Sequence, residues 1–192
     1  MDGSRFVSVQ VLVIPEDPTN NGYILKPVVD MVLAEAGKPA AKVRVLGNPR
    51  VRGYDDAVRV VRKDLASRYG FMDLWLFLPD ADRASSGAMQ VLEEDLHAQG
   101  VTLLCCPAVP EVEVYACVAY RGEIASWQEV RADPRMREAY FDPLLEKHGD
   151  RRKPGRGRRM MIERSLRSRR AFFQLCPEIA DLRDRVQASL AS

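Results

Sequence analysis

The sequence has few cysteines and histidines and no long hydrophobic run. Its cysteines are Cys105, Cys106, Cys117 and Cys176. They show no CxxC spacing, and neither histidine lies in a ligand pattern, so we expect reduced, buried thiols and not a zinc site. No stretch of about 18 apolar residues is present, and the first residues lack the order of a signal peptide. We therefore expect a cytoplasmic protein with no membrane association.

Several catalytic motifs are also missing from the sequence. It contains no phosphate-binding loop of the GxxxxGK[ST] type, and Gly155-Arg156-Gly157 follows no predicted strand. Neither a Ser/His/Asp nor a Cys/His arrangement is apparent. Intrinsic ATPase activity and nucleophilic side-chain catalysis are therefore not supported.

The chain is an ordinary globular sequence with an uneven charge distribution. It has 192 residues, 46% hydrophobic and 29% charged, which is enough for one full core, and its net charge is +2. Between Lys147 and Arg170, eleven Lys/Arg face only Asp150 and Glu163, so this segment carries +9 and the remainder −7. A basic segment attached to an acidic body favours a polyanionic partner. A solvated helix face that keeps the protein soluble is the alternative.

Apolar runs alternate with amphipathic stretches, a pattern typical of a parallel sheet covered by helices. The sequence predicts strands near 6–14, 42–46, 74–78 and 101–105, and helices near 23–36, 54–69 and 86–99. The run 74–78 is continuously apolar, as expected of a central strand buried on both faces. We predict an α/β fold with about four parallel strands and flanking helices.

The remainder of the chain is predicted to be mostly helical. Pro110 at a first helical position favours a helix through the following apolar segment. Residues 160–173 and 177–190 are predicted to form two closing helices. We divide the chain into an α/β domain, residues 1–146, and a basic helical C-terminal extension, residues 147–192, packed on the same domain.

Acidic residues follow two of the predicted strands. Glu16 follows the first strand, and Asp80 and Asp82 follow the third. The carboxyl ends of parallel strands lie at one edge of the sheet, so these side chains are expected to converge. Carboxylates at that spacing can share one hard cation such as Mg²⁺. Taken singly, each acid is equally typical of a helix cap or a turn.

A third acidic segment, Pro110-Glu111-Val112-Glu113-Val114-Tyr115, completes a pattern that resembles the Toprim domain. The resemblance covers roughly residues 6–120. It is nearest to the Toprim domains of overcoming-lysogenisation-defect nucleases and to small bacterial Toprim-like proteins paired with an ATPase. Many Toprim domains have Gly after the first acid, where this chain has Asp17-Pro18. That departure bears on catalysis more than on the fold, because proline stiffens a turn that is normally permissive.

The resemblance implies a metal-dependent activity on nucleic acid. It assigns Glu16, Asp80, Asp82 and Glu113 to a Mg²⁺ or Mn²⁺ site, with the first three as catalytic residues. The implied function is a nuclease or related phosphodiester-handling protein, with a bacterial anti-phage defence locus and a partner ATPase as its implied setting. The alternative is a non-catalytic binding or regulatory module that assembles with a partner protein.

Arginines provide the predicted nucleic-acid contacts. Arg83, next to the acidic pair, is expected to bind a phosphate or to form a salt bridge with Asp80 or Glu16. In the basic segment, phosphate contact is favoured over base stacking, because aromatic residues are not interleaved with the arginines. The predicted contacts there are Arg158, Arg159, Arg167, Arg169 and Arg170.

Overall fold

A four-stranded parallel sheet with strand order β2-β1-β3-β4 forms the centre of the protein. The computed structural model describes residues 8–82, 84–124 and 126–191. The strands are β1 (Gln10–Pro15), β2 (Lys42–Val45), β3 (Leu74–Leu78) and β4 (Leu103–Cys105). The predicted parallel sheet is thus confirmed, with each strand within a few residues of its predicted range.

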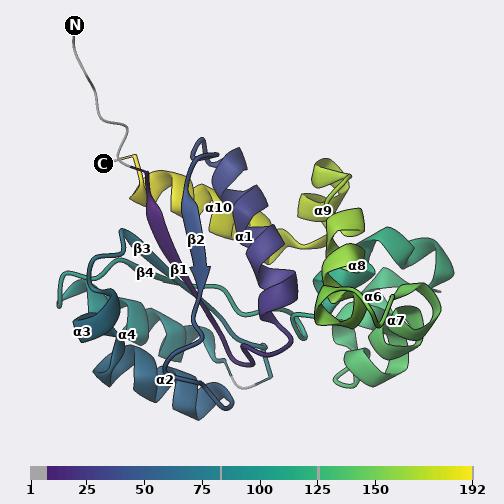
Figure 1. Cartoon of the computed structure of the whole chain (residues 1–192), viewed down its shortest axis with the longest axis horizontal. Coiled ribbons are helices and arrows are strands. Elements are labelled where there is room, and N and C mark those ends of the chain that lie inside the picture. Colours follow the sequence, from purple (N-terminus) through teal and green to yellow (C-terminus); the bar gives the residue numbers. More distant parts are fainter. Residues whose placement is uncertain (1–7, 83, 125, 192) are drawn as a thin grey trace, which may run out of the picture.

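Helices cover both faces of the sheet (Figure 1). One face carries α1 (Gly22–Glu35) and α10 (Pro177–Ser189). The other carries α2 (Tyr54–Lys63), α3 (Leu65–Tyr69) and α4 (Ser86–His97). Each face has its own hydrophobic core, so the two cores together enclose the sheet.

Strand β3 shows why the sheet needs two layers of helices. All of its side chains are buried. Trp75 and Phe77 pack under α2, α3 and α4, whereas Leu76 and Leu78 pack in the core beneath α1 and α10. Successive strand side chains point to opposite faces, so a continuously apolar strand is stable only when both faces are covered.

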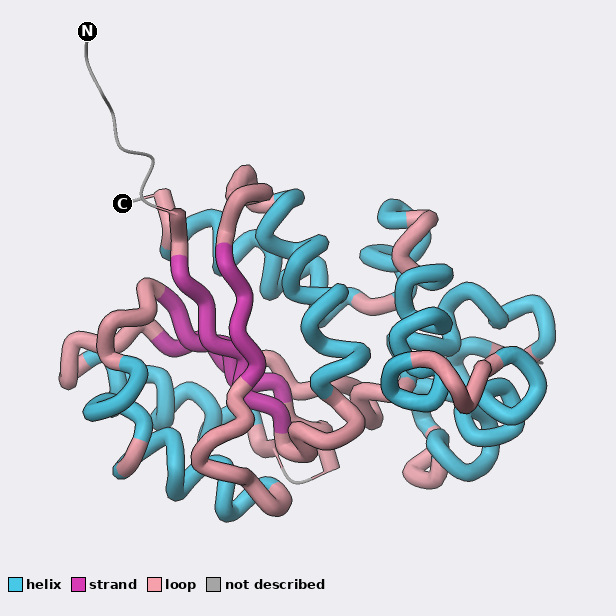
Figure 2. The backbone as a smooth tube through the Cα atoms, in the orientation of Figure 1, coloured by secondary structure: helices cyan, strands magenta, loops and turns pink. Residues whose placement is uncertain are grey.

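Residues 114–175, which we call the helical lobe, lie beside the sheet, and those of them that the structure describes form helices and loops only (Figure 2). Its elements are α5 (Val114–Cys117), the 3₁₀ helix η1 (Val118–Glu123), α6 (Trp127–Ala132), the π-helical turn η2 (Arg137–Phe141), α7 (Asp142–His148), the 3₁₀ turn η3 (Pro154–Gly157), α8 (Arg158–Ser165) and α9 (Arg169–Leu175). The helical lobe begins at Val114 and continues past residue 147, where the basic extension was predicted to begin.

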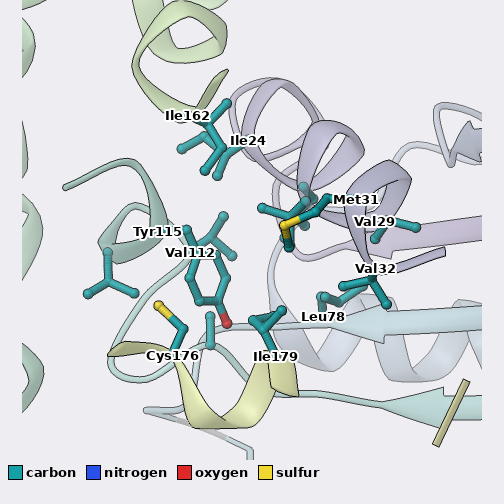
Figure 3. Close-up of a cluster of buried hydrophobic side chains, with 14 of the residues drawn as sticks. Ile24, Val29, Met31, Val32, Leu78, Val112, Tyr115, Ile162, Cys176 and Ile179 are labelled. Atoms are coloured by element: carbon teal, nitrogen blue, oxygen red, sulfur yellow. The ribbon is translucent and has the colours of Figure 1, made fainter. Parts of the chain in front are cut away.

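The helical lobe and the sheet share one hydrophobic core. Tyr115 of α5 is fully buried in the same cluster as Ile24 of α1, Ile162 of α8 and Ile179 of α10 (Figure 3). Helix α10 then packs beside α1 on the sheet. The C-terminal helices α8 and α10 therefore both pack against α1 in this core.

Three local predictions differ from the structure. The predicted helix at 54–69 is two helices, α2 and α3, separated at Asp64. The predicted helix at 160–173 is two helices, α8 and α9, separated at Leu166–Ser168. The helix predicted to begin at Pro110 begins four residues later, at Val114.

All four cysteines are buried free thiols, as predicted. Within the ranges that the structure describes, no helix combines the length and apolar character needed to cross a bilayer.

Candidate functional site

The two acidic strand ends predicted to converge lie next to each other. Strands β1 and β3 are adjacent, with Pro15 paired to Leu78, so Glu16 and Asp80 follow neighbouring strands at the same edge. The chain leaves β1 for β2 on one side and leaves β3 for β4 on the other. Such a reversal of strand order opens the crevice where ligands bind in open α/β sheets.

Backbone hydrogen bonds hold Asp80 in this position. The Asp80 N–H donates to Glu16 Oε2 at 3.3 Å, and the Val112 N–H donates to Asp80 Oδ1 at 2.9 Å. The Ala81 N–H donates to the carbonyl oxygen of Ala108 at 2.9 Å. Asp80 therefore links the end of β3 both to Glu16 and to the segment that follows β4.

The loop after β1 is organised by Asp17. Its carboxylate accepts the Thr19 N–H at 2.8 Å and the Asn20 side-chain amide at 3.0 Å, and its carbonyl oxygen accepts the Asn21 N–H at 3.0 Å. These bonds turn the chain into α1. Asp17 thus stabilises the turn that positions Glu16 and does not add its carboxylate to the acidic strand ends.

A surface pocket of about 440 Å³ opens beside Asp80. It lies between the ends of β3 and β4 and the segment around α6 and η2. Its charged lining residues are Asp80, Asp82, Glu111, Glu138 and Arg135. Arg135 and Glu138 were not predicted, because only the fold brings the helical lobe to this edge. We call this feature the acidic pocket.

Burial and crowding of carboxylates perturb the electrostatics of the site. Burial raises the pKa of Asp80 to about 7, and the nearby negative charges of Glu113, Glu16 and Glu111 raise it as well. The hydrogen bond from the Val112 N–H acts in the opposite direction. Burial also raises the pKa of Glu111. A site that destabilises its own carboxylates is one that a cation would stabilise.

The predicted metal ligand Glu113 faces the protein interior. The Glu113 residue is only 3% exposed, whereas Glu111 lines the acidic pocket. Burial raises the pKa of Glu113, and the positive charges of Arg137 and Arg158 act against that rise. The sequence alone would allow either of these acids to face the site and leave the other exposed to solvent. Glu113 is not exposed, because the helical lobe encloses it.

Arg158, a predicted nucleic-acid contact, is not on the surface. Its residue is 6% exposed, and its guanidinium lies over the Phe141 ring at 5.4 Å from the centroid. Its Nη1 donates to the carbonyl oxygen of Gly155 at 3.4 Å. The positive charge of Arg158 also acts against the rise in the pKa of Glu113. Arg158 is therefore an internal counter-charge of the helical lobe.

The other predicted arginine contacts are exposed, but they differ in their partners. Arg159 pairs with Glu163 at 2.8 Å, and Arg169 pairs with Glu35. Arg167 and Arg170 form no ion pair with any residue that the structure describes. Arg83, predicted to bind a phosphate near Asp80, lies outside the described residues.

The donor set at the acidic pocket suits a cation that keeps several waters. Among the described residues, no group of three or more His, Cys, Asp or Glu side chains is arranged to hold a metal ion. Mg²⁺ in phosphate-handling sites, however, takes one or two carboxylates and completes its shell with waters and substrate oxygens. The Glu16 carboxylate lies at the Asp80 backbone N–H, and exposed Asp82 lines the same pocket as Asp80, so carboxylate oxygens from both strand ends lie in this region.

The fold and this site define an α/β protein with a four-stranded parallel sheet, flanking helices and a helical C-terminal region. Comparison with known protein families, with curated proteins and with solved structures finds no match. The geometry of the chain itself must therefore support any functional assignment.

Proposed function

We propose that this chain is a Toprim-like protein that acts on nucleic-acid phosphodiesters with Mg²⁺ or Mn²⁺ bound near Glu16 and Asp80. The observation that carries the proposal is the contact between these two acids, which follow adjacent strands where the strand order reverses. That edge is where ligands bind in open α/β sheets. The acidic pocket beside it provides room for a hydrated ion and a phosphate group.

Each acidic residue of the site then has its own role in the reaction. A divalent ion at this site would polarise a phosphoryl oxygen and lower the pKa of a bound water. The Val112 N–H bonds to Asp80 Oδ1 and orients the carboxyl group. Asp80, held in this way, supplies an oxygen ligand to the ion. Glu16 serves as ligand or proton acceptor, and Asp82 and Glu111 lie where they can bind waters around the ion.

Loss of a proton from Asp80 couples this site to pH. Because the pKa of Asp80 is about 7, the carboxyl is part protonated at neutral pH before an ion binds. Metal ligands must be deprotonated, so ion binding releases this proton and strengthens as the pH rises towards 8. The proposal thus includes a pH dependence that an exposed carboxylate would not give.

A second candidate function is a non-catalytic binding module that assembles with a partner protein, such as an ATPase. It is favoured by the absence of a three-ligand metal cluster among the described residues. It is also favoured by the bond between Asp80 and the Val112 N–H, which gives Asp80 a structural use without any metal. In this case the acidic pocket would receive a basic group of the partner.

A nuclease assay separates the two candidates. Purified chain is incubated with labelled single- and double-stranded DNA and RNA, with Mg²⁺, with Mn²⁺ or with a chelator. We expect cleavage that requires metal and that Asp80→Asn abolishes, because the amide retains the Val112 hydrogen bond but not the charge. The matched control is Asp30→Asn, which removes one exposed carboxylate elsewhere, on α1. Metal-independent cleavage, or equal cleavage by Asp80→Asn, would contradict the catalytic proposal.

A further inference from the structure

The basic segment divides into neutralised and unneutralised side chains. Within it, four cations have carboxylate partners on the surface: Lys147 with Glu123, Arg152 with Asp150, Arg159 with Glu163 and Arg169 with Glu35. Arg158 is buried near Glu113. These residues account for much of the positive charge that the sequence concentrates there, so the segment as a whole is not one uniform polyanion-binding face.

Three arginines of the helical lobe instead surround a hollow of about 320 Å³. Arg164 and Arg167 come from the end of α8 and the turn after it, and Arg121 comes from η1. The remaining lining residues are small or apolar: Val118, Ala119, Ser165, Ser168 and Ala171. We call this feature the arginine hollow.

The arginine hollow contains positive charge without a counter-charge. No carboxylate is among its described lining residues. None of Arg121, Arg164 and Arg167 forms an ion pair within the described part of the chain. Three guanidinium groups around one hollow repel one another unless an anion lies between them.

Packing beneath the arginine hollow fixes the walls that carry these arginines. The Arg164 guanidinium lies over the ring of buried Tyr120, 5.2 Å from its centroid. Buried Ser165 donates its hydroxyl to the carbonyl oxygen of Ala116 and accepts the Ala119 N–H, both at 3.0 Å. These contacts tie α8 to α5 and η1. Binding to a preformed site loses less side-chain entropy than binding to free arginines.

We propose that the arginine hollow binds a backbone phosphate of nucleic acid, an inference that rests on the proposed function and names its substrate-contacting surface. Guanidinium groups match phosphate oxygens with paired, charge-assisted hydrogen bonds. Small side chains at Ala119, Ser168 and Ala171 let a phosphate approach all three arginines. A protein partner would instead be expected to use a large aromatic or aliphatic anchor, whereas this lining has Val118 as its one side chain larger than alanine or serine besides the arginines.

The assignment shifts the predicted contacts within the basic segment. Arg167 is retained from the sequence prediction, and Arg164 is added. Arg121 lies outside the basic segment and is brought in by the fold alone. Arg159 and Arg169 become the natural controls, because each is exposed and already neutralised by a glutamate.

The test compares two double variants that remove equal charge. Binding of a labelled DNA duplex, and of an RNA strand of the same sequence, is measured by fluorescence anisotropy across a series of salt concentrations in the presence of a chelator. The test variant is Arg121→Gln with Arg167→Gln, and the control variant is Arg159→Gln with Arg169→Gln. Circular dichroism and the unfolding midpoint of each variant verify that both are folded.

We expect the test variant to lose binding of the one phosphate that the arginine hollow holds. The magnitude of the slope of log affinity against log salt for duplex DNA should then fall by about 0.9, the contribution of one neutralised phosphate, and affinity at 0.1 M salt should fall roughly 10-fold. The control variant should bind nearly as wild type. Equal weakening of the two variants would overturn the proposal, because it would reduce the effect to net charge. Unchanged binding by the test variant, or no binding by wild type, would also overturn it.

The outcome is separable from that of the proposed catalytic function. If metal-dependent cleavage and nucleic-acid affinity both survive in the test variant, the arginine hollow is excluded and the catalytic proposal stands. If the test variant alone loses affinity while wild type cleaves nothing with any metal, the arginine hollow stands and the catalytic proposal falls.

Discussion

Asp80 is the residue on which the site depends most, because it is acidic and only partly exposed to solvent. Its carboxylate orients the segment after β4 through the Val112 N–H, while its own N–H reaches Glu16. The pKa of about 7 means that the folded protein tolerates the neutral acid better than the charged one. Without a bound cation, ionising Asp80 costs stability.

The cost of ionising Asp80 makes the free energy of unfolding depend on pH. In the unfolded chain the pKa returns towards 3.8, so between pH 4 and pH 7 the folded state binds more protons than the unfolded state. The free energy of unfolding contributed by this group therefore falls as pH rises through that window, and it levels off above pH 7. We expect wild type to lose roughly 2–3 kcal/mol more than Asp80→Asn between pH 5 and pH 8 in chelator.

Urea unfolding at the two pH values measures this difference. Asparagine retains an oxygen for the Val112 N–H, so the comparison isolates the charge from the hydrogen bond. Identical pH dependence in wild type and Asp80→Asn would show that the Asp80 carboxyl is not destabilised by burial.

Single residues were predictable where the strand pattern fixed their position. Glu16 and Asp80 were expected together because both directly follow apolar strands, and they are in contact. The sequence could not show which of Glu111 and Glu113 faces the site, because that depends on where α5 begins. The burial of Arg158 was also invisible in the sequence, since it depends on Phe141 and Glu113 from other elements.

At the scale of elements, charged side chains connect α10 to the rest of the chain. Arg131 of α6 makes a two-pronged bond to Glu178, with both nitrogen–oxygen distances at 2.8 Å. Arg185 bonds both oxygens of Glu93 on α4 at 2.7 Å and also reaches the carbonyl oxygen of Cys105 at 2.9 Å. Helix α10 thereby joins the helical lobe to the end of β4.

The Arg131–Glu178 bond should contribute measurably to stability because it is mostly shielded from water. The two side chains are 17% and 14% exposed, compared with 47% and 46% for the Lys26–Asp30 pair on α1, which has the same 2.8 Å separation. We expect Arg131→Met to lower the free energy of unfolding by about 1.5–3 kcal/mol. Lys26→Met should lower it by about 0.5 kcal/mol or less.

Chemical denaturation of the two variants makes this comparison. An equal loss in both would mean that burial adds nothing to the Arg131–Glu178 bond. A loss in Arg131→Met that disappears in high salt would lead to the same conclusion, because exposed pairs are the ones that salt screens.

Elements were predictable where hydrophobic periodicity was strong. The four strands and the helices between them were found because each buries a continuous or regularly spaced apolar set. The break between α8 and α9 was not found, because Ser168 and its neighbours interrupt the helix with no proline or glycine to mark the end. The helical lobe lacked a clear pattern because its elements are short and pack against one another.

At the scale of the whole molecule, opposite charges occupy separate places. The acidic pocket lies at the carboxyl edge of the sheet, and the arginine hollow lies on the helical lobe. The sequence predicted this division of charge but not its geometry, since Arg121 and Glu138 join their sites only after folding. The division supports an arrangement in which one surface holds the nucleic acid and the other holds the ion.

Equilibrium binding of Mn²⁺ shows whether Glu16 and Asp80 bind a divalent ion, and the measurement needs neither substrate nor partner. Electron paramagnetic resonance follows the loss of the free Mn²⁺ signal as chain is added at pH 8 and at pH 6. We expect wild type to bind Mn²⁺ at pH 8 and more weakly at pH 6, where Asp80 is protonated. Asp80→Asn and Glu16→Gln should each lose this binding, and Asp30→Asn should retain it. Binding that is absent in wild type, or equal in wild type and Asp80→Asn, would show that Glu16 and Asp80 do not form a divalent-ion site.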